Sequence, residues 1–198
     1  MSHAKILDAI VPYEFRNLPY KMMLECGCGL GTWGYLIRAE NRGSQAYIVG
    51  VDITKEYLHF CKKHKIYDDL ILADVSKLPF RSNTFDFALA SEVIEHLNKK
   101  RGIDFLDQIE TMTRNKILLT TPNGNWPIKG AAGAERHMSE WKVKDFTKRG
   151  YKVRGVGLKG FDPGRVPHMF CILMRFVFTP ISYLLPYFGE LLIATKIK

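Results

Sequence analysis

The sequence lacks the features that mark membrane-spanning and secreted proteins. Its 198 residues contain no run of about 20 apolar residues, the length that a transmembrane helix requires. An uncharged stretch near the C-terminus, 176–188, has only 13 residues and is interrupted by Pro180 and Pro186. The N-terminus shows no pattern of a cleavable signal peptide. These absences predict a cytoplasmic protein.

Cysteine is scarce as well, and its spacing argues against a disulfide or structural-metal framework. The chain has four cysteines, which form no paired Cys-x-x-Cys motifs. Cys26 and Cys28 lie within one glycine-rich segment, where a bridge is sterically implausible. We therefore expect the thiols to be reduced.

The charge is positive overall and unevenly distributed. The chain carries a net charge of +9. From Ser139 onward, 11 Lys and Arg stand against 4 Asp and Glu, which gives +7, whereas residues 1–138 contribute 18 against 16, or +2. A basic C-terminal third suits anionic lipid, nucleic acid or an acidic metabolite, and solvated surface charge is the plain alternative.

Short apolar runs alternate with amphipathic stretches along the chain, which is typical of an α/β fold with a mostly parallel sheet. The expected strands are 22–26, 46–51, 70–73, 85–90, 116–121, 152–156 and 190–197. The expected helices are 33–41, 55–64, 99–112 and 139–150, with Thr54 and Ser139 as N-caps. We predict a single domain over 1–198, with an N-terminal helix or lid at 1–20 and an apolar insertion at 157–189 between the last two strands.

A glycine-rich turn follows the first expected strand and opens a helix. In the segment 24–31, glycines allow the backbone to turn tightly and approach a ligand. Asp52 ends the second strand, where a carboxylate can accept hydrogen bonds from ribose hydroxyls. Asp74 ends the third strand, over the expected position of an adenine ring. This order of residues predicts a nucleoside cofactor.

Two cofactors compete for this turn, because Gly29–Gly34 also fits the Gly-x-Gly-x-x-Gly pattern of dinucleotide binding. The carboxylate of Glu25, just before the first glycine, would repel the pyrophosphate of NAD. S-adenosylmethionine (SAM) instead carries a sulfonium and an ammonium, which an acid attracts. No Lys or Arg occurs in 25–34 to hold a phosphate. The balance favours SAM.

Five segments in order, LECGCGLGTWG, GVDIT, ADVSKLPF, FDFALASEVIEHL and ILLTTPNG, resemble the class I SAM-dependent methyltransferases. The sequence is most similar to their type 11 group, which includes quinone-biosynthesis methyltransferases. The resemblance covers about 22–123. It implies a Rossmann-like, doubly wound, mostly parallel seven-stranded sheet with an antiparallel last strand.

The resemblance also implies a set of cofactor-binding residues: Glu25, Gly27, Cys28, Gly29, Gly31, Asp52, Ile53, Asp74, Val75 and Ser91. The first five would line the methionine end of SAM. Asp52 would bind the ribose, and Ile53 would pack on the adenine. Asp74 would accept from the exocyclic amine, the Val75 N–H would donate to a ring nitrogen, and Ser91 would line the methionyl pocket.

Methyl transfer needs a protein base only when the acceptor is a weak acid such as a hydroxyl. The favoured candidates are Glu92 and His137, the latter on a loop. Glu95 and His96 resemble a family dipeptide that orders a helix start. Because no cluster of metal-ligating acids is evident beside 91–97, we expect no metal ion and a metal-independent reaction.

The predicted function is methyl transfer from SAM to a small-molecule or lipid-like acceptor, which leaves S-adenosylhomocysteine. A non-catalytic SAM-binding regulatory module and an NAD-dependent oxidoreductase are the alternatives. Nucleic acid is disfavoured as the acceptor; in particular, no Asn-Pro-Pro-Tyr type signature follows the fourth strand, which argues against amino methylation of DNA bases. We expect a monomer or homodimer.

The apolar segment 168–188 has more apolar residues than one buried helix face requires. A face containing Met169, Ile172, Leu173 and Phe176 is expected to be core. Because Phe178 and its neighbours are left over and basic residues flank the segment, we expect a lipophilic rim that contacts a membrane peripherally.

Overall fold

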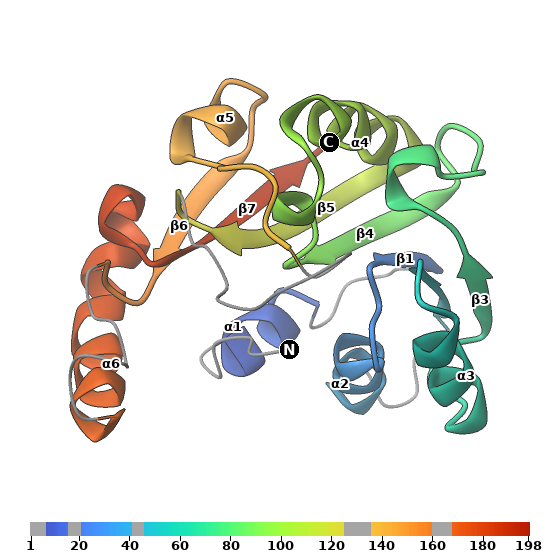
Figure 1. Ribbon diagram of the computed structural model, residues 1–198, viewed down its shortest axis with the longest axis horizontal. Coiled ribbons are helices and arrows are strands. Elements are labelled where there is room, and N and C mark those ends of the chain that lie inside the picture. Colours follow the sequence, from blue (N-terminus) through green and yellow to red (C-terminus); the bar gives the residue numbers. More distant parts are fainter. Residues whose placement is uncertain (1–6, 16–20, 41–45, 125–135, 160–167) are drawn as a thin grey trace. The chain divides into compact units, whose positions relative to one another are not determined.

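The computed structural model describes residues 7–15, 21–40, 46–124, 136–159 and 168–198 (Figure 1). The elements in chain order are α1 (Leu7–Tyr13), β1 (Met22–Cys26), α2 (Thr32–Glu40), β2 (Tyr47–Asp52), α3 (Lys55–Lys63), β3 (Asp69–Leu72), η1 (Val75–Lys77), β4 (Phe85–Ser91), η2 (Ile94–His96), α4 (Lys99–Met112), β5 (Thr113–Pro122), α5 (Val143–Thr147), β6 (Lys152–Val156), α6 (His168–Leu184), η4 (Pro186–Phe188) and β7 (Leu191–Ile197). The elements labelled η are 3₁₀-helices.

The strands form one seven-stranded sheet in the order β3-β2-β1-β4-β5-β7-β6. The pairs of β1 with β2, β1 with β4 and β2 with β3 are parallel, whereas β7 runs antiparallel to β6. This topology confirms the predicted α/β class and the mostly parallel sheet with an antiparallel last strand.

The chain divides into two compact units, each described by itself. Unit 1 comprises residues 1–91, 100–117 and 198, and unit 2 comprises 92–99 and 118–197. The single domain expected over 1–198 stays a prediction.

In unit 1, helices cover both faces of the parallel strands. Helix α4 lies on one face, and α2 and α3 lie on the other (Figure 1). Strand β4 is buried over 85–90, apolar on both faces except at Asp86. A continuous rather than alternating apolar run is what a parallel strand between two helical layers requires. In the same register, Cys26 pairs with Val51 and Ala90, so the carboxyl ends of β1, β2 and β4 meet at one edge.

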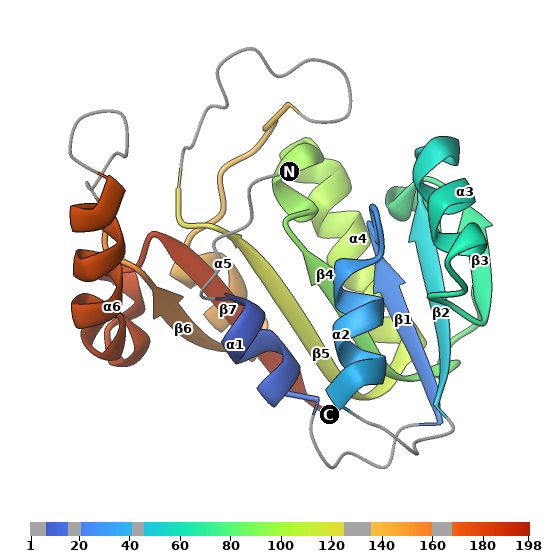
Figure 2. The ribbon, with the colours of Figure 1, turned by 90° about the horizontal axis from the view of Figure 1, so that it is seen from below.

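In unit 2, α6 packs against the edge strand β6 (Figure 2). Gly155 of β6 makes this close approach possible, because a Cβ there would lie 2.6 Å from the Ser182 carbonyl oxygen. The Thr179 hydroxyl accepts a hydrogen bond of 3.2 Å from the Gly157 N–H, and Ser182 is fully buried. The small and polar side of α6 therefore faces the strand.

The opposite side of α6 is apolar and exposed, which corrects one prediction. Met169 and Leu173, expected in the core, are 77% and 57% exposed. Further exposed members recur every three or four residues: Val177, Ile181 and Leu184. These five residues are called the α6 stripe below. Phe178 is half-buried, and the side chains of Ile172 and Phe176 lie outside the described residues. Among the helices that are described, none is long and apolar enough to cross a membrane.

Two predicted helix caps are wrong in detail. Helix α5 begins at Val143, not after Ser139, and ends at Thr147. The Ser139 hydroxyl instead accepts a hydrogen bond of 2.8 Å from the indole N–H of Trp141. Thr54 does precede α3, but its side chain makes no cap bond. Its N–H donates to Asp52, because that carboxylate lies two residues earlier at the end of β2.

Candidate cofactor site and acid–histidine cluster

The turn after β1 contains three glycines in the left-handed region. Gly27, Gly29 and Gly31 have φ angles of 68°, 52° and 83°, which side chains with a Cβ rarely adopt. The N–H groups of Gly27 and Cys28 donate to the Val51 carbonyl at 2.8 and 3.0 Å. The turn is thus tied to the end of β2.

Close packing is a second reason for glycine on the helical side of this turn. A Cβ on Gly31 would lie 2.7 Å from Ile66 Cδ1, and one on Gly34 would lie 2.5 Å from the ring of Tyr67. Glycine at these positions lets α2 approach the segment that precedes β3. The same segment supplies the Tyr67 hydroxyl that contacts Glu25.

Glu25 is buried beneath the turn with an incompletely paired carboxyl group. The Tyr67 hydroxyl donates to Oε2 at 2.8 Å, whereas Oε1 has no hydrogen-bond partner among the described residues. Burial raises the pKa of Glu25 to about 8, although hydrogen bonds from the Tyr67 hydroxyl and the Gly34 backbone N–H lower it. A buried carboxyl with a free oxygen beside a glycine turn fits the ammonium of SAM and disfavours a pyrophosphate.

Asp52 joins the turn to the end of β2. One carboxylate oxygen accepts from the Gly29 N–H at 2.8 Å and the other accepts from the Thr54 N–H at 2.8 Å. Each oxygen keeps a second lone pair, with which it can accept from a ribose hydroxyl. Asp52 therefore holds the turn in shape and also remains suited to the predicted ribose contact.

The thiols around the turn are free, as predicted for Cys26, Cys28 and Cys61. The side chain of Cys171 lies outside the described residues. The Cys61 thiol donates to the Gly29 carbonyl at 3.3 Å. Burial raises the pKa of Cys61 to about 11. These thiols are neutral packing groups at physiological pH and are poor nucleophiles.

The expected adenine side contains an ion pair that the sequence did not reveal. Asp74 accepts from the N–H and hydroxyl of Ser76 at 2.9 and 2.8 Å, and it pairs with Arg101 of α4. Partial burial raises the pKa of Asp74, but the Ser76 hydrogen bonds and the Arg101 charge outweigh it and lower the pKa below its usual value. Asp74 also caps η1. Its contact with the adenine amine stays a prediction.

Three further predicted residues lie at the same carboxyl edge of unit 1. Ile53 follows β2 and is 58% exposed, as an apolar surface for an adenine ring would be. Val75 begins η1 and is buried. Ser91 ends β4, directly after the residue that pairs with Cys26. The edge position suits a ligand, because ligands of open parallel sheets bind beyond the carboxyl ends of the strands.

In unit 2, the candidate base Glu92 has a strained backbone. Its φ angle is 56°, in the left-handed region. Its N–H donates to the Thr120 carbonyl at 3.0 Å, and the Thr120 hydroxyl donates to Glu92 Oε1 at 3.1 Å. Strain that neighbouring bonds hold in place is common at functional sites.

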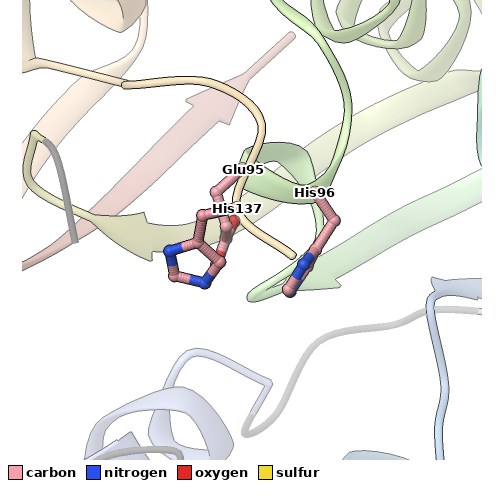
Figure 3. A group of neighbouring side chains, drawn as sticks. All are labelled: Glu95, His96 and His137. Carbon is pink, nitrogen blue, oxygen red and sulfur yellow. The ribbon is translucent and has the colours of Figure 1, made fainter. Parts of the chain in front are cut away.

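The second candidate base, His137, lies with Glu95 and His96, the pair that resembles the family dipeptide at a helix start. The possible donor atoms of Glu95, His96 and His137 all lie within 4.8 Å of one another (Figure 3). The rings of His96 and His137 have centroids 4.9 Å apart in an edge-to-face arrangement. We call these three residues the acid–histidine cluster.

Backbone hydrogen bonds assemble this cluster from two distant segments. The N–H groups of Met138 and Ser139 donate to the Glu95 carbonyl at 2.7 and 3.1 Å. They fasten the residues after His137 onto η2. No sequence spacing reveals this contact, so the sequence does not predict that His137 lies beside the Glu95–His96 pair.

Comparisons with known proteins agree with the geometry of unit 1. Residues 24–116 match a family model described as a methyltransferase domain. The chain is 28% identical to an uncharacterized protein of Methanocaldococcus jannaschii over 71% of this chain and 59% of that protein. It is also 28% identical to a malonyl-[acyl-carrier protein] O-methyltransferase of Legionella pneumophila, over 70% of this chain and 52% of that one. The chain thus spans little more than half the length of these relatives.

The fold is also found in solved structures. A SAM-dependent methyltransferase from Archaeoglobus fulgidus superposes with a TM-score of 0.65 over 98% of this chain and 91% of that chain. The two sequences are 18% identical. At this identity the likeness concerns the fold, and it agrees with the strand order described above.

Proposed function

We propose that the chain is a class I SAM-dependent methyltransferase of the type 11 group, because residues 24–116 match a methyltransferase-domain family model, and that it transfers a methyl group from SAM to a small or lipophilic acceptor. The observation that carries the proposal is the unpartnered Oε1 of the buried Glu25 beside the glycine turn. A buried carboxyl oxygen without a partner is costly unless a ligand pairs with it. The ammonium of SAM supplies that partner.

SAM would bring an electrophilic methyl group on a positively charged sulfur, so the protein mainly has to bind and orient. Glu25 would pair with the ammonium, and Asp52 would accept from the ribose hydroxyls. With a pKa of about 8, Glu25 carries a proton near pH 7 in the cofactor-free protein. Pairing with a cation favours the ionised carboxylate, so that proton is released on binding.

The acceptor is proposed to be a small molecule whose weakly acidic group gives up a proton to Glu92 or His137. The O-methyltransferase among the relatives favours an oxygen acceptor. A base is required only for a weakly acidic hydroxyl, because a carboxylate or a neutral amine already has a free lone pair. Both residues remain proposals for this role.

Calorimetric titrations with SAM, S-adenosylhomocysteine and NADH test the cofactor directly. We expect micromolar binding of the first two and none of NADH. An assay with SAM labelled in the methyl group, against a pool of metabolites, then tests transfer. Binding of NADH alone would support an oxidoreductase. Binding of SAM without transfer to any fraction would support a non-catalytic module.

The exposed apolar residues of the α6 stripe support the proposal that the protein, proposed to be cytoplasmic, contacts a lipid surface. Helix α6 turns Thr179 and Ser182 toward β6 and leaves five apolar side chains exposed on its other side. This arrangement is the reverse of an ordinary surface helix. Together with the excess of 11 basic over 4 acidic residues after residue 138, it favours an anionic membrane surface as the occupant of the stripe.

Vesicle binding distinguishes a membrane surface from a second copy of the chain as the partner of the α6 stripe. We expect the protein to bind anionic vesicles at low salt, and Leu173→Asp to weaken that binding about 10-fold. Tyr35→Asp, at an exposed apolar position of α2, is the matched control and should bind as the wild type does. If the wild type ignores vesicles but forms a dimer that Leu173→Asp disrupts, the stripe is a subunit contact and the membrane proposal fails.

A further inference from the structure

The acid–histidine cluster of unit 2 has the composition of a metal site, and we propose that Glu95, His96 and His137 bind one divalent transition-metal ion. Two imidazoles and one carboxylate are common ligands of zinc and related ions. The possible donor atoms already lie within 4.8 Å of one another. Around a single ion they would be about 3.4 Å apart. Binding an ion would therefore require the side chains to rotate toward one another.

Glu95 gives the first independent indication of a cation. It is 2% exposed, and its Oε1 has no hydrogen-bond partner among the described residues. A buried carboxyl oxygen without a partner is unfavourable, and a bound cation would pair with it.

The other oxygen of Glu95 is oriented in advance. The Thr121 hydroxyl donates to Oε2 at 2.9 Å. This bond fixes the plane of the carboxyl group and leaves Oε1 available. Hydrogen bonds of this kind to ligating carboxylates orient them for a metal.

His96 is oriented in a similar way. Its Nδ1 lies 3.3 Å from the backbone carbonyl oxygen of Arg136. The tautomer protonated at Nδ1 donates to that carbonyl and presents Nε2 as a ligand. A backbone carbonyl partner on the other ring nitrogen is usual for histidines that bind metals. Figure 3 shows both rings beside the Glu95 side chain.

The backbone holds the two ligand segments together without an ion. Besides the bonds from Met138 and Ser139 to Glu95, the indole of Trp141 donates to the Ile94 carbonyl at 3.2 Å. Trp141 is 1% exposed, so this anchor is part of the core. The two backbone segments that carry the ligands are therefore held in place, which lowers the cost of binding an ion.

The ligand set selects among metals. Imidazole nitrogens favour zinc and neighbouring transition metals, whereas magnesium prefers oxygen ligands. Three protein ligands also leave a coordination position open, as in catalytic zinc sites. If the proposed methyl transfer holds, that position would accept an acceptor oxygen and lower its pKa, and Glu92 rather than the metal-bound His137 would take up the proton. This proposal reverses the metal-independent reaction expected from the sequence.

Calorimetry on the chelator-treated full chain tests the site without any activity assay. We expect one equivalent of Zn²⁺ to bind, and Mg²⁺ to bind at least 100-fold more weakly. Glu95→Gln and His137→Ala should each weaken Zn²⁺ binding at least 10-fold, and Thr121→Val should weaken it less. His59→Ala, an exposed histidine of α3, is the control and should match the wild type.

S-adenosylhomocysteine affinity, measured on every variant, shows that each is folded and separates this proposal from the proposed function. The proposal is overturned if no single equivalent of Zn²⁺ binds, or if Glu95→Gln and His137→Ala bind it as the wild type does. Co²⁺ provides a spectroscopic check of the ligands. Visible bands without a thiolate-to-cobalt transition support the cluster, whereas a strong thiolate transition would place the ion on the cysteines of unit 1 and overturn it.

Discussion

The two units build their chemical groups in different ways. In unit 1, the glycine turn and Glu25 lie within one short segment, and a strand register places Asp52 beside them. In unit 2, Glu95 and His137 come from distant segments that backbone bonds fasten together. The candidate cofactor site of unit 1 is thus a local motif at the ends of strands. The acid–histidine cluster of unit 2 instead depends on contacts between distant segments. Changes in unit 1 should therefore act on SAM binding, and changes in unit 2 on chemistry or metal binding.

The largest expected effect comes from Gly29→Val. A branched side chain at a φ of 52° strains the turn and fills the space that the methionyl group would occupy, so SAM binding should become undetectable by calorimetry. Gly150→Val is the control, because Gly150 also has a positive φ of 82° but nothing closer than 4.0 Å to its Cβ. Equal SAM affinity in a folded Gly29→Val variant would exclude the turn as the cofactor site.

The next effect is on the stability of the cofactor-free protein. Folding raises the Glu25 pKa from 4.5 to about 8, so the folded state binds this proton more tightly. The stabilisation is complete below pH 4.5 and is lost as the pH rises toward 8. As the pH rises from 5 to 7, the loss of the Glu25 proton should lower the free energy of unfolding by about 3 kcal/mol.

Urea unfolding of the wild type and Glu25→Gln at both pH values measures this contribution. The variant should lose less stability than the wild type over that range, by about the same 3 kcal/mol. Identical pH dependence in the two proteins would mean that Glu25 does not titrate as the structure indicates.

Asp52→Asn should weaken SAM binding by about 2 kcal/mol, or roughly 30-fold. Its amide keeps the size of the carboxylate but loses charged hydrogen bonds to the ribose and to the Gly29 N–H. Asp69→Asn, an exposed residue of β3, serves as the control in the same calorimetric titration. If Asp52→Asn binds SAM as tightly as the wild type, Asp52 does not bind the ribose.

The smallest effect on cofactor affinity is expected for His137→Ala. If the cluster acts on the acceptor, S-adenosylhomocysteine affinity should stay within about 2-fold of the wild type, while turnover of an identified acceptor falls about 100-fold. Parallel binding and kinetic measurements check this. A large loss of cofactor affinity with unchanged turnover would contradict the division of roles between the units.

The sequence predicted the fold where the signal is local. The bounds of β1, α4 and β6 agree with the predicted ranges, because apolar runs and helical periodicity are properties of short segments. Helix α5 is shorter than predicted, because the Trp141 indole engages the Ser139 hydroxyl.

The predictions were weakest where tertiary contacts decide the outcome. The sequence predicted an exposed apolar rim near α6 but placed Met169 and Leu173 in the core, because the close approach at Gly155, which selects the small polar side of the helix for β6, is a tertiary contact. Arg101 was missed as the partner of Asp74, since α4 brings it there from a later segment. The acid–histidine cluster was missed for the same reason.

Proton release on cofactor binding tests the central role of Glu25 most directly. Calorimetric titration of S-adenosylhomocysteine at pH 7, in two buffers of different ionisation enthalpy, gives the number of protons released. The wild type should release close to one proton per ligand, because the ligand ammonium ionises a carboxyl whose pKa is about 8. Glu25→Gln should bind more weakly and release none. Equal proton release and equal affinity in the two proteins would contradict the assignment of Glu25 as the ammonium partner.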